Sequence, residues 1–399
     1  MSPPACSSCS ARKMRARQAP ASPARGIDPM KTPQGRATLV FYVHAMAGGG
    51  AEKVMARLAT GYARRGDRVV LVVDHRAEEW LGLLDERIEM AVLPQLPVLS
   101  TLAFAARLFT LAPDVSISAL GATNLKHLVA ALLAGRRRRA VICYHGFAEG
   151  EPSKLSQIGY KLIPVLSRLA AQSVAVSDAL RDELIRRFHA APARLRTVYN
   201  PASPEIAHPP VTAEALGARE PIVVAVGRLV VDKGLLFLVK AFAQVAYPGA
   251  RLIVLGKGPD LQRLQSEAER LGIADRVEFP GYVADTGAYL SRARCFVSPS
   301  YRETFGLAVV EALDHGLAVV ATDSGGPREI VNSPELGRIV PVGDEAAMAA
   351  AISASLSAPG DPSPRQRRSR DFTLRAAMEG YDRIFEEISP GFAAASSNA

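Results

Sequence analysis

Two glutamates in the stretch PSYRETFGLAVVEAL, Glu303 and Glu311, are spaced as a pair of carboxylates that could hold one ligand. Glu303 lies in a loop after the strand-like run 295–298, and Glu311 lies about a turn and a half into the next helix. Backbone amides near Gly306 and Leu307 begin that helix and point out of the carboxyl end of the strand. Vicinal hydroxyl groups, which sugars carry, donate paired hydrogen bonds to a carboxylate. The spacing predicts contacts with different parts of an elongated ligand; the alternative is a surface turn acid and an exposed helix residue.

Two cations, Arg228 and Lys233, flank a predicted helix start in GRLVVDKG, directly after the strand-like run 221–227. Arginine offers a forked set of donors and lysine a point charge, so the pair suits a diphosphate at the end of a strand. The alternative for either residue taken singly is a solvated basic loop.

Glycines follow two other strand-like runs. Gly48, Gly49 and Gly50 come directly before a helix that begins near Glu52, and Gly256 lies in the turn GKGPD. Glycine lets backbone amides approach an anion closely, although a flexible turn is the alternative. The triple glycine is neither GxGxxG with a following acid nor GxxxxGK[ST], so an ordinary dehydrogenase or P-loop assignment lacks its fingerprint.

Short apolar runs alternate with longer helical patterns from Met30 onward, which is typical of parallel α/β sheets. In such sheets ligands collect at the carboxyl ends of the strands. The predicted strands are 38–43, 68–73, 115–118, 140–144, 173–176 and 195–198 in the first half and 221–227, 251–256, 277–279, 295–298 and 318–322 in the second. The predicted helices include 52–65, 152–170, 235–245, 260–271 and 306–315.

Two domains joined by a hinge are expected from the 399 residues and from five prolines over residues 200–221. The predicted boundaries are a disordered extension 1–36, a first domain 37–205, a linker 206–220, a second domain 221–370, a helix 371–388 and a disordered tail 389–399.

The composition, 48% apolar and 22% charged, is that of a globular protein, and no apolar stretch reaches the ~18 residues of a membrane span. The net charge of +9 is uneven, because residues 1–29 carry five Lys or Arg against one Asp. Aromatic residues make up only 6% and do not interleave with the basic runs. From these features we predict that the protein has no nucleic-acid partner.

Four cysteines do not form a disulfide framework. Cys6 and Cys9 form a CxxC without a second ligand pair at zinc spacing. Cys143 and Cys295 lie in apolar runs and predict buried thiols of a reducing compartment. We therefore expect a cytoplasmic protein, with either Met1 or Met30 as its true start.

The ordered series GGGAEK, GRL with DKG, GKGP, the glutamate stretch and GGPREI resembles the retaining GT-B glycosyltransferases of family 4, or glycosyl transferases group 1. The mark of that family is two glutamates with seven residues between them. The resemblance covers roughly residues 38–388. It implies two Rossmann-like domains facing across a cleft, with the helix 371–388 crossing back to the first domain. It also implies sugar transfer from a nucleoside diphosphate sugar to a glycan or lipid-linked acceptor, in the synthesis of cell-surface polysaccharide or lipopolysaccharide.

The resemblance also implies roles for the residues above. Arg228 and Lys233 would neutralise the diphosphate, Glu311 would hold the ribose, and Glu303 would bind the donor sugar without acting as a nucleophile. His145, in YHG after a strand, would line the donor sugar or the acceptor; the alternative is a local hydrogen-bonding residue. The catalytic residues implied are Glu303, His145, Lys233 and Arg228, and the donor-binding residues are Gly48, Gly49, Arg228, Lys233, Gly256, Phe305, Gly306, Leu307, Glu303 and Glu311.

No two aspartates are separated by one residue, so the DxD metal motif of the other glycosyltransferase fold is absent. Because Arg228, Lys233 and helix dipoles would compensate the diphosphate charge, we expect metal-independent activity without a cofactor. The GGGAEK loop favours a UDP-sugar over a GDP-sugar. The transferred group would be a hexose or an N-acetylhexosamine.

A peripheral contact with an anionic membrane is a further hypothesis. Lys154, Lys161 and Arg168 recur on one face of the predicted helix 152–170, alongside an apolar stripe, and RRRR occupies 136–139. The alternative is an ordinary amphipathic helix packed on its own sheet, with a solvated arginine loop. Competing functions are a nucleotide-sugar epimerase or phosphorylase on the same fold and a catalytically silent or regulatory GT-B domain.

Overall fold

The structure is a computed structural model that describes residues 37–47, 49–77, 79–147, 154–204, 206 and 208–392, apart from the side chains of residues 154 and 155. The predicted extension 1–36, with Cys6 and Cys9, lies outside the described residues, as do Gly48 and residues 393–399. Within the described part, no helix is both long and apolar enough to span a bilayer.

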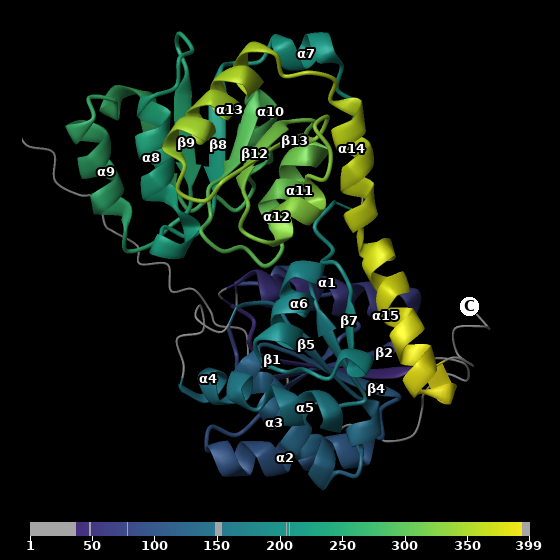
Figure 1. The fold of residues 1–399 in the computed structure, drawn as a ribbon. Coiled ribbons are helices and arrows are strands. Elements are labelled where there is room, and N and C mark those ends of the chain that lie inside the picture. The colour runs from purple at the N-terminus through teal and green to yellow at the C-terminus, as the bar shows by residue number, and fades with distance from the viewer. Residues whose placement is uncertain are drawn as a thin grey trace, which may run out of the picture. The chain divides into compact units, whose positions relative to one another are not determined.

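Seven parallel strands form the sheet of the first domain (Figure 1). They are β1 (Thr38–Ala45), β2 (Arg68–His75), β3 (Glu89–Val92), β4 (Val115–Ala119), β5 (Ala140–Tyr144), β6 (Gln172–Ala175) and β7 (Leu195–Thr197). Their spatial order is β3-β2-β1-β4-β5-β6-β7. The period-two alternation of β1 places Leu39, Phe41 and Val43 in one buried cluster and Val40 and Tyr42 in another, so both faces of the sheet are covered.

Six parallel strands form the sheet of the second domain. They are β8 (Ile222–Val226), β9 (Arg251–Leu255), β10 (Val277–Gly281), β11 (Cys295–Ser298), β12 (Ala318–Thr322) and β13 (Gly337–Val340). Their order, β10-β9-β8-β11-β12-β13, repeats that of the first sheet. The predicted fold class of two parallel-sheet, Rossmann-like domains is confirmed. The order reverses beside β1 and beside β8, and such switch points are where open α/β sheets bind ligands.

Two strands, β3 and β13, were not predicted, and both lie at a sheet edge. Three of the four residues of β3 are exposed, and β13 buries only Val340. Because these two strands are covered less fully than the central ones, they lack the continuous apolar run by which the central strands were predicted.

The helices cover both faces of each sheet. In the first domain they are α1 (Gly50–Arg65), α2 (Pro97–Leu111), α3 (Gly121–Leu133), α4 (Lys154–Lys161), α5 (Ile163–Leu169) and α6 (Asp178–Arg186). The remaining helices are α7 (Ala213–Gly217), α8 (Leu235–Ala243), α9 (Leu261–Arg270), α10 (Gly287–Arg292), α11 (Leu307–Asp314), α12 (Gly326–Ile330), α13 (Glu345–Ser357), α14 (Ser363–Ser369) and α15 (Leu374–Ile388). The segment predicted as a linker, 206–220, therefore contains the short helix α7.

The single helix predicted over 152–170 is wrong, because the chain forms α4 and then α5 there. Pro164 lies in the first turn of α5. A proline ring has no N–H and clashes with the preceding turn, so it begins a helix more easily than it continues one.

The last helix, α15, packs on the first domain although the second domain precedes it in the chain (Figure 1). Tyr381 and Phe385 join the cluster that contains Tyr62 of α1. Arg65 donates to Asp382 at 2.7 Å. The prediction that the disordered tail begins at residue 389 is wrong, because Phe392 is fully buried against Tyr62 and Phe385.

The prediction of buried thiols is confirmed for Cys143 and Cys295, which are both free and buried. Burial raises the pKa of each thiol to about 12. At neutral pH both therefore remain protonated and unreactive.

Candidate active site

A cleft of about 1340 Å³ lies where the carboxyl ends of the two sheets meet. Its walls include the loops that follow β1, β5, β8 and β11. These loops leave the strands at or next to the two switch points. Among the predicted site residues that the structure describes, all line this cleft, and Gly48 lies outside the description.

Lys233 and Glu303 form an ion pair within the second domain. Lys233 Nζ donates to Glu303 Oε2 at 2.5 Å, and Ser300 Oγ donates to the same oxygen at 3.3 Å. The Lys233 side chain is 25% exposed and that of Glu303 is 15% exposed. The pair is thus partly shielded from water, which strengthens its electrostatic interaction, and it remains accessible from the cleft.

Gly234 explains how the lysine loop can lie so close to the glutamate loop. Its backbone is left-handed, with φ of 63°, and a Cβ built on it would lie 2.0 Å from the carbonyl oxygen of Pro299. Tyr301 N donates to Asp232 O at 2.9 Å across the same contact. The DKG sequence therefore places Lys233 beside Glu303 because only glycine fits at the third position.

The backbone of Glu303 is held on its other side as well. Glu303 N donates to Ser324 O at 2.9 Å, and Gly326 N donates to Glu303 O at 2.8 Å. These bonds join the loop after β11 to the GGPREI segment after β12. The conformation of Glu303 is consequently fixed by neighbours from three loops of one domain.

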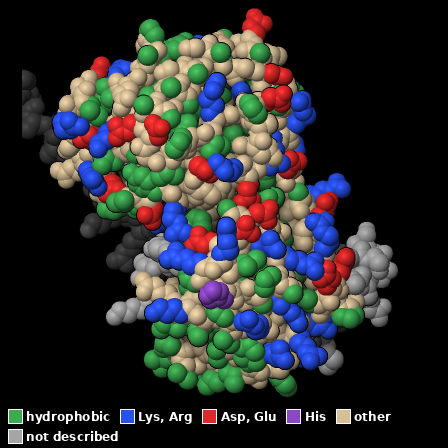
Figure 2. Space-filling model, in the orientation of Figure 1, with side chains coloured by type: hydrophobic (Ala, Val, Ile, Leu, Met, Phe, Trp, Pro, Cys, Tyr) green, Lys and Arg blue, Asp and Glu red, His purple; other side chains and the backbone are tan. Residues whose placement is uncertain are grey.

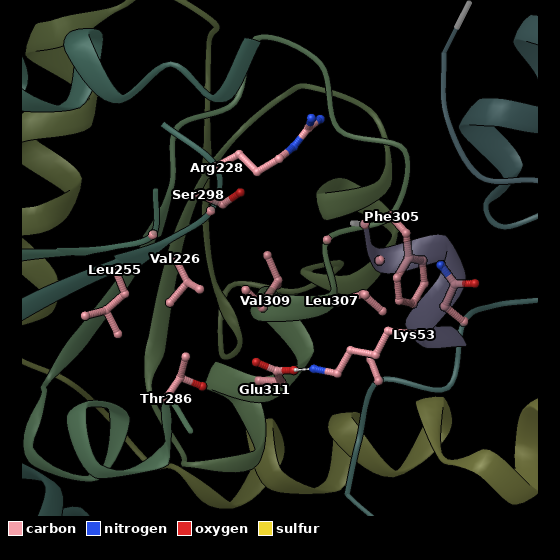
Figure 3. A pocket seen from close by; sticks show the side chains of 18 of the residues that line it. Lys53, Val226, Arg228, Leu255, Thr286, Ser298, Phe305, Leu307, Val309 and Glu311 are labelled. Carbon is pink, nitrogen blue, oxygen red and sulfur yellow. Dashed lines mark hydrogen bonds and ion pairs between the residues drawn. The ribbon is translucent and has the colours of Figure 1, made fainter. Parts of the chain in front are cut away.

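Glu311 forms its ion pair across the cleft, with Lys53 of α1. Lys53 Nζ lies 3.4 Å from Glu311 Oε1, and the two side chains point toward one another in Figure 3. Glu311 is 22% exposed, so it is not the exposed helix residue of the alternative interpretation. Lys53 was not singled out from the sequence, although it ends the motif GGGAEK.

The N-termini of α1 and α11 approach each other between the two glutamates. A Cβ on Gly50 would lie 2.9 Å from Leu307 Cδ1, so the end of the Leu307 side chain would have to move to make room for it. Gly306 precedes α11 with a left-handed φ of 101°. The amides at both helix starts, with the positive ends of two helix dipoles, form a suitable environment for an anion.

Arg228 and Gly256 lie on the opposite wall. Arg228 is exposed, and no hydrogen bond or ion pair joins its side chain to another described residue; Figure 3 shows it pointing away from Lys53 and Glu311. Gly256 has φ of 149°, and a Cβ there would lie 1.8 Å from Gly227 O. Glycine at 256 therefore lets the loops after β8 and β9 touch, which leaves Arg228 free to turn toward a ligand.

His145 directly follows β5 and lines the cleft from the first domain. Its carbonyl oxygen accepts a hydrogen bond from Thr304 Oγ1 at 2.8 Å, whereas its two ring nitrogens are shielded from solvent and have no hydrogen-bond partner. Burial lowers the pKa of His145 to about 4. The imidazole is therefore neutral at pH 7, with one donor and one acceptor that have no partner among the described residues.

The Phe305 side chain is 2% exposed, so its ring is mostly covered within the fold although the residue lines the cleft. It packs against Tyr199 and Phe372, with ring centroids 6.0 and 5.5 Å away. These two aromatic residues lie where the chain leaves and re-enters the first domain.

Further contacts between the domains come from residues that the sequence did not reveal. Arg302 donates to both carboxylate oxygens of Glu183 at 2.7 and 2.6 Å and lies 4.0 Å from the ring centroid of Phe147. Glu329 accepts from the backbone amides of Asp178 and Ala179 at the start of α6. Partners more than 100 residues apart leave no signal in a local pattern.

At the far end of the cleft, beyond Glu311, the loop after β10 supplies residues 282–287. Thr286 lies on the same side as Glu311 in Figure 3. Two glutamates, Glu303 and Glu311, therefore line one cleft with three cations and two helix starts. This set of groups suits a ligand with a polyhydroxyl end, an anionic centre and a second polar end.

Comparisons with known families match both halves of the chain. Residues 48–206 match Glycosyltransferase Family 4, and residues 212–371 match Glycosyl transferases group 1.

Individual relatives are more distant. The lipopolysaccharide core biosynthesis glycosyltransferase LpsE of Rhizobium meliloti (strain 1021) is 36% identical over 135 residues, which are 34% of this chain and 39% of that protein. Alpha-maltose-1-phosphate synthase of Mycolicibacterium smegmatis is 28% identical over 299 residues, covering 67% of this chain and 73% of that protein. The matching region thus spans well under half of LpsE.

Among solved structures, Anabaena HepE in complex with UDP and glucose is similar, with a TM-score of 0.74. The match covers 88% of this chain and 100% of the HepE chain, at 21% sequence identity. A likeness at that identity shows a common fold.

Proposed function

This chain belongs to the GT-B glycosyltransferases of family 4, and from that membership and its cleft we propose that it transfers a sugar from a nucleoside diphosphate sugar with retention of configuration. The observation that carries the proposal is the Lys233–Glu303 ion pair beside the start of α11. It joins a diphosphate-binding cation to a sugar-binding carboxylate at one switch point.

We propose that the diphosphate binds between Lys233, Arg228 and the amides that begin α11. An ammonium group has three donors, so Lys233 can keep its hydrogen bond to Glu303 while donating to a phosphate oxygen. Arg228 has no competing partner among the described residues and can add a forked contact. These positive groups would stabilise the charge that develops on the leaving diphosphate, without a metal ion or other cofactor.

Glu303 and Glu311 would hold the two ends of the donor. Glu303 would accept hydrogen bonds from sugar hydroxyls, and Glu311 would accept them from the ribose, next to the loop 282–287 that would receive the base. The acceptor oxygen would form a bond to the anomeric carbon on the face from which the diphosphate departs. As the bond between the anomeric carbon and the phosphate oxygen breaks, that oxygen takes the proton of the acceptor hydroxyl.

His145 would position the donor sugar or the acceptor. Because its pKa of about 4 keeps the ring neutral, it can donate one hydrogen bond and accept another without adding charge next to the anomeric centre. Its two unpartnered nitrogens would then gain the partners that they lack in the free protein.

For the donor we propose a UDP-sugar that carries a hexose or an N-acetylhexosamine, and for the acceptor a glycan or lipid-linked glycan of cell-surface polysaccharide or lipopolysaccharide synthesis. The matches to UDP-bound HepE and to LpsE support this choice. The location we propose is cytoplasmic, where nucleotide sugars are available.

The test is hydrolysis of a panel of UDP-, GDP- and ADP-sugars by the purified protein in EDTA. We expect one donor to turn over, and we expect Glu303→Ala and Lys233→Ala to lower the rate about 10²- to 10³-fold. Glu269→Ala, at an exposed position on α9, is the matched control and should leave the rate unchanged.

If no donor turns over, thermal unfolding with UDP or GDP distinguishes two outcomes. Stabilisation that is lost in Lys233→Ala would support a transferase that needs its acceptor. The absence of stabilisation by any nucleotide would overturn the proposal in favour of a catalytically silent domain.

A further inference from the structure

The outer face of the first domain exposes apolar side chains to an unusual extent. On α2 and directly before it these are Leu96, Val98, Leu99, Leu102 and Phe109, with exposed fractions from 50% to 75%. Figure 2 shows hydrophobic side chains gathered at the bottom of the view, where Figure 1 places α2. Single exposed apolar residues are ordinary on a protein surface, but a contiguous patch marks an interaction site.

Neighbouring helices extend this surface. α3 packs against α2, α4 and α5, and the exposed apolar residues of these neighbours are Val129, Leu132, Leu133, Ile158, Leu162 and Val165. We call the exposed surface of these four helices the α2–α5 face.

The residues that anchor α2 to its domain are different ones. Ser100, Phe104, Ala105 and Leu108 are buried, so the apolar residues on the outside are surplus to the packing of the fold. α2 is consequently apolar on both sides, unlike a surface helix of a globular protein, which turns a polar face to water.

Buried and exposed residues can also be distinguished in the apolar stripe that was predicted for residues 152–170, which lies on α4 and α5. Ile163 and Leu166 face the interior, whereas Ile158, Leu162 and Val165 face solvent. The alternative in which that stripe packs on its own sheet is therefore wrong for these three residues. The side chains of Lys154 and Leu155 lie outside the description.

The described residues of the α2–α5 face carry charge of one sign. The segments 93–113, 115–148 and 152–177, which contain its four helices, have no Asp or Glu. Cations lie on or beside it at Arg107, Arg138, Lys161 and Arg168. A second copy of the chain is a poor occupant, because an isologous contact would oppose cation to cation with no carboxylate to pair them.

From the exposed apolar residues and the absence of Asp and Glu from its four helices, we propose that the α2–α5 face docks on the surface of an anionic lipid bilayer. The apolar side chains of α2 enter the boundary between headgroups and acyl chains, while the cations contact headgroup phosphates. The combination of both contributions gives binding that depends on anionic lipid and weakens as salt rises. This inference stands apart from the transferase reaction, because none of its residues lines the cleft.

The experiment is flotation of the full chain with vesicles of phosphatidylcholine alone or mixed with phosphatidylglycerol. We expect flotation with the mixed vesicles, and we expect Val98→Ser/Leu102→Ser/Phe109→Ser to lower the bound fraction about tenfold or more. Ile206→Ser/Val342→Ser removes exposed apolar residues outside the face and should float like the unaltered protein.

A second pair of variants tests the charge. Arg138→Glu/Lys161→Glu/Arg168→Glu should bind the mixed vesicles more weakly, whereas Arg263→Glu, at an exposed position on α9, should not. All of these side chains lie outside the cleft, so donor hydrolysis without lipid should stay unchanged and reports separately on the proposed function.

Three outcomes would overturn the proposal. The first is failure of the unaltered chain to float with phosphatidylglycerol vesicles. The second is equal loss in the face variants and their controls. The third is light scattering that shows a dimer dissolved by the α2 substitutions while flotation persists, because the face would then join two copies of the chain.

Discussion

In the second domain, the loops after β8, β11 and β12 hold one another through backbone contacts, and both members of the Lys233–Glu303 pair come from them. The first domain contributes to the same cleft mainly through contacts that cross it, including Lys53 with Glu311 and the His145 carbonyl with Thr304. The two sheets have the same strand order, so topology does not cause this difference. Tight loop packing gives the second domain a pre-organised site, whereas the groups of the first domain depend on how the domains meet.

The largest effect on stability is expected from Gly234→Ala, which disrupts the packing between two loops of the second domain. The left-handed backbone would cost an alanine about 1–2 kcal/mol, and the contact of its Cβ with Pro299 O would add about 1–3 kcal/mol. Urea unfolding should show the loss, together with loss of donor hydrolysis. Gly249→Ala is the matched control, because Gly249 has φ of 71° in open space and should show only the backbone term. Equal losses in the two variants would refute the close packing.

A smaller effect for each residue involved should follow from acidification, through histidines that are buried without charge. Burial lowers the pKa of His127 to about 3 and those of His145 and His315 to about 4, from about 6.5 in the unfolded chain. Between these values the unfolded chain binds protons that the folded protein does not. The free energy of unfolding is therefore highest above pH 6.5 and falls as pH drops toward 4, by at most about 1.4 kcal/mol per pH unit for each group.

Urea titrations from pH 7 to pH 4.5 measure this slope. His127 lies wholly in the core of the first domain, where its ring nitrogens lie 2.9 and 2.8 Å from Ser118 Oγ and Ser116 Oγ. His127→Gln should lower stability at pH 7 and make the slope shallower. An unchanged slope would show that His127 is not among the groups responsible.

The smallest effect is expected from Lys53→Met, which removes only the contact that crosses the cleft. A partly exposed ion pair contributes about 0–1 kcal/mol, so donor KM should change no more than about fivefold. Steady-state kinetics beside Lys233→Met provides the comparison. If Lys53→Met lowered kcat as much as Lys233→Met, the first domain would supply as much of the catalytic site as the second.

Residues in the buried strands, and residues at the carboxyl ends of those strands, were predicted well. The central strands and the position of Glu303, Glu311, Lys233 and Arg228 at one cleft followed from apolar runs and from the rule that strand ends collect ligands. The sequence shows glycine at 234 and 256, but it does not show the carbonyl oxygens that exclude a Cβ at these two positions.

The contacts between domains could not be predicted from local patterns. Lys53 meets Glu311 over 258 positions of sequence, and Arg302 meets Glu183 over 119. The exposed face of α2 escaped notice for a related reason, since an apolar helix is ordinarily read as a buried one. Only the packing of the whole domain shows which of its residues are left outside.

The return of α15 to the first domain also sets an order of assembly. Tyr381 and Phe385 fill the cluster around Tyr62, yet they leave the ribosome after the entire second domain. The second domain is therefore an insertion within the first in terms of folding, and it can complete its core while the first still lacks one helix. Although most chains finish their N-terminal domain first, this chain must finish that domain last.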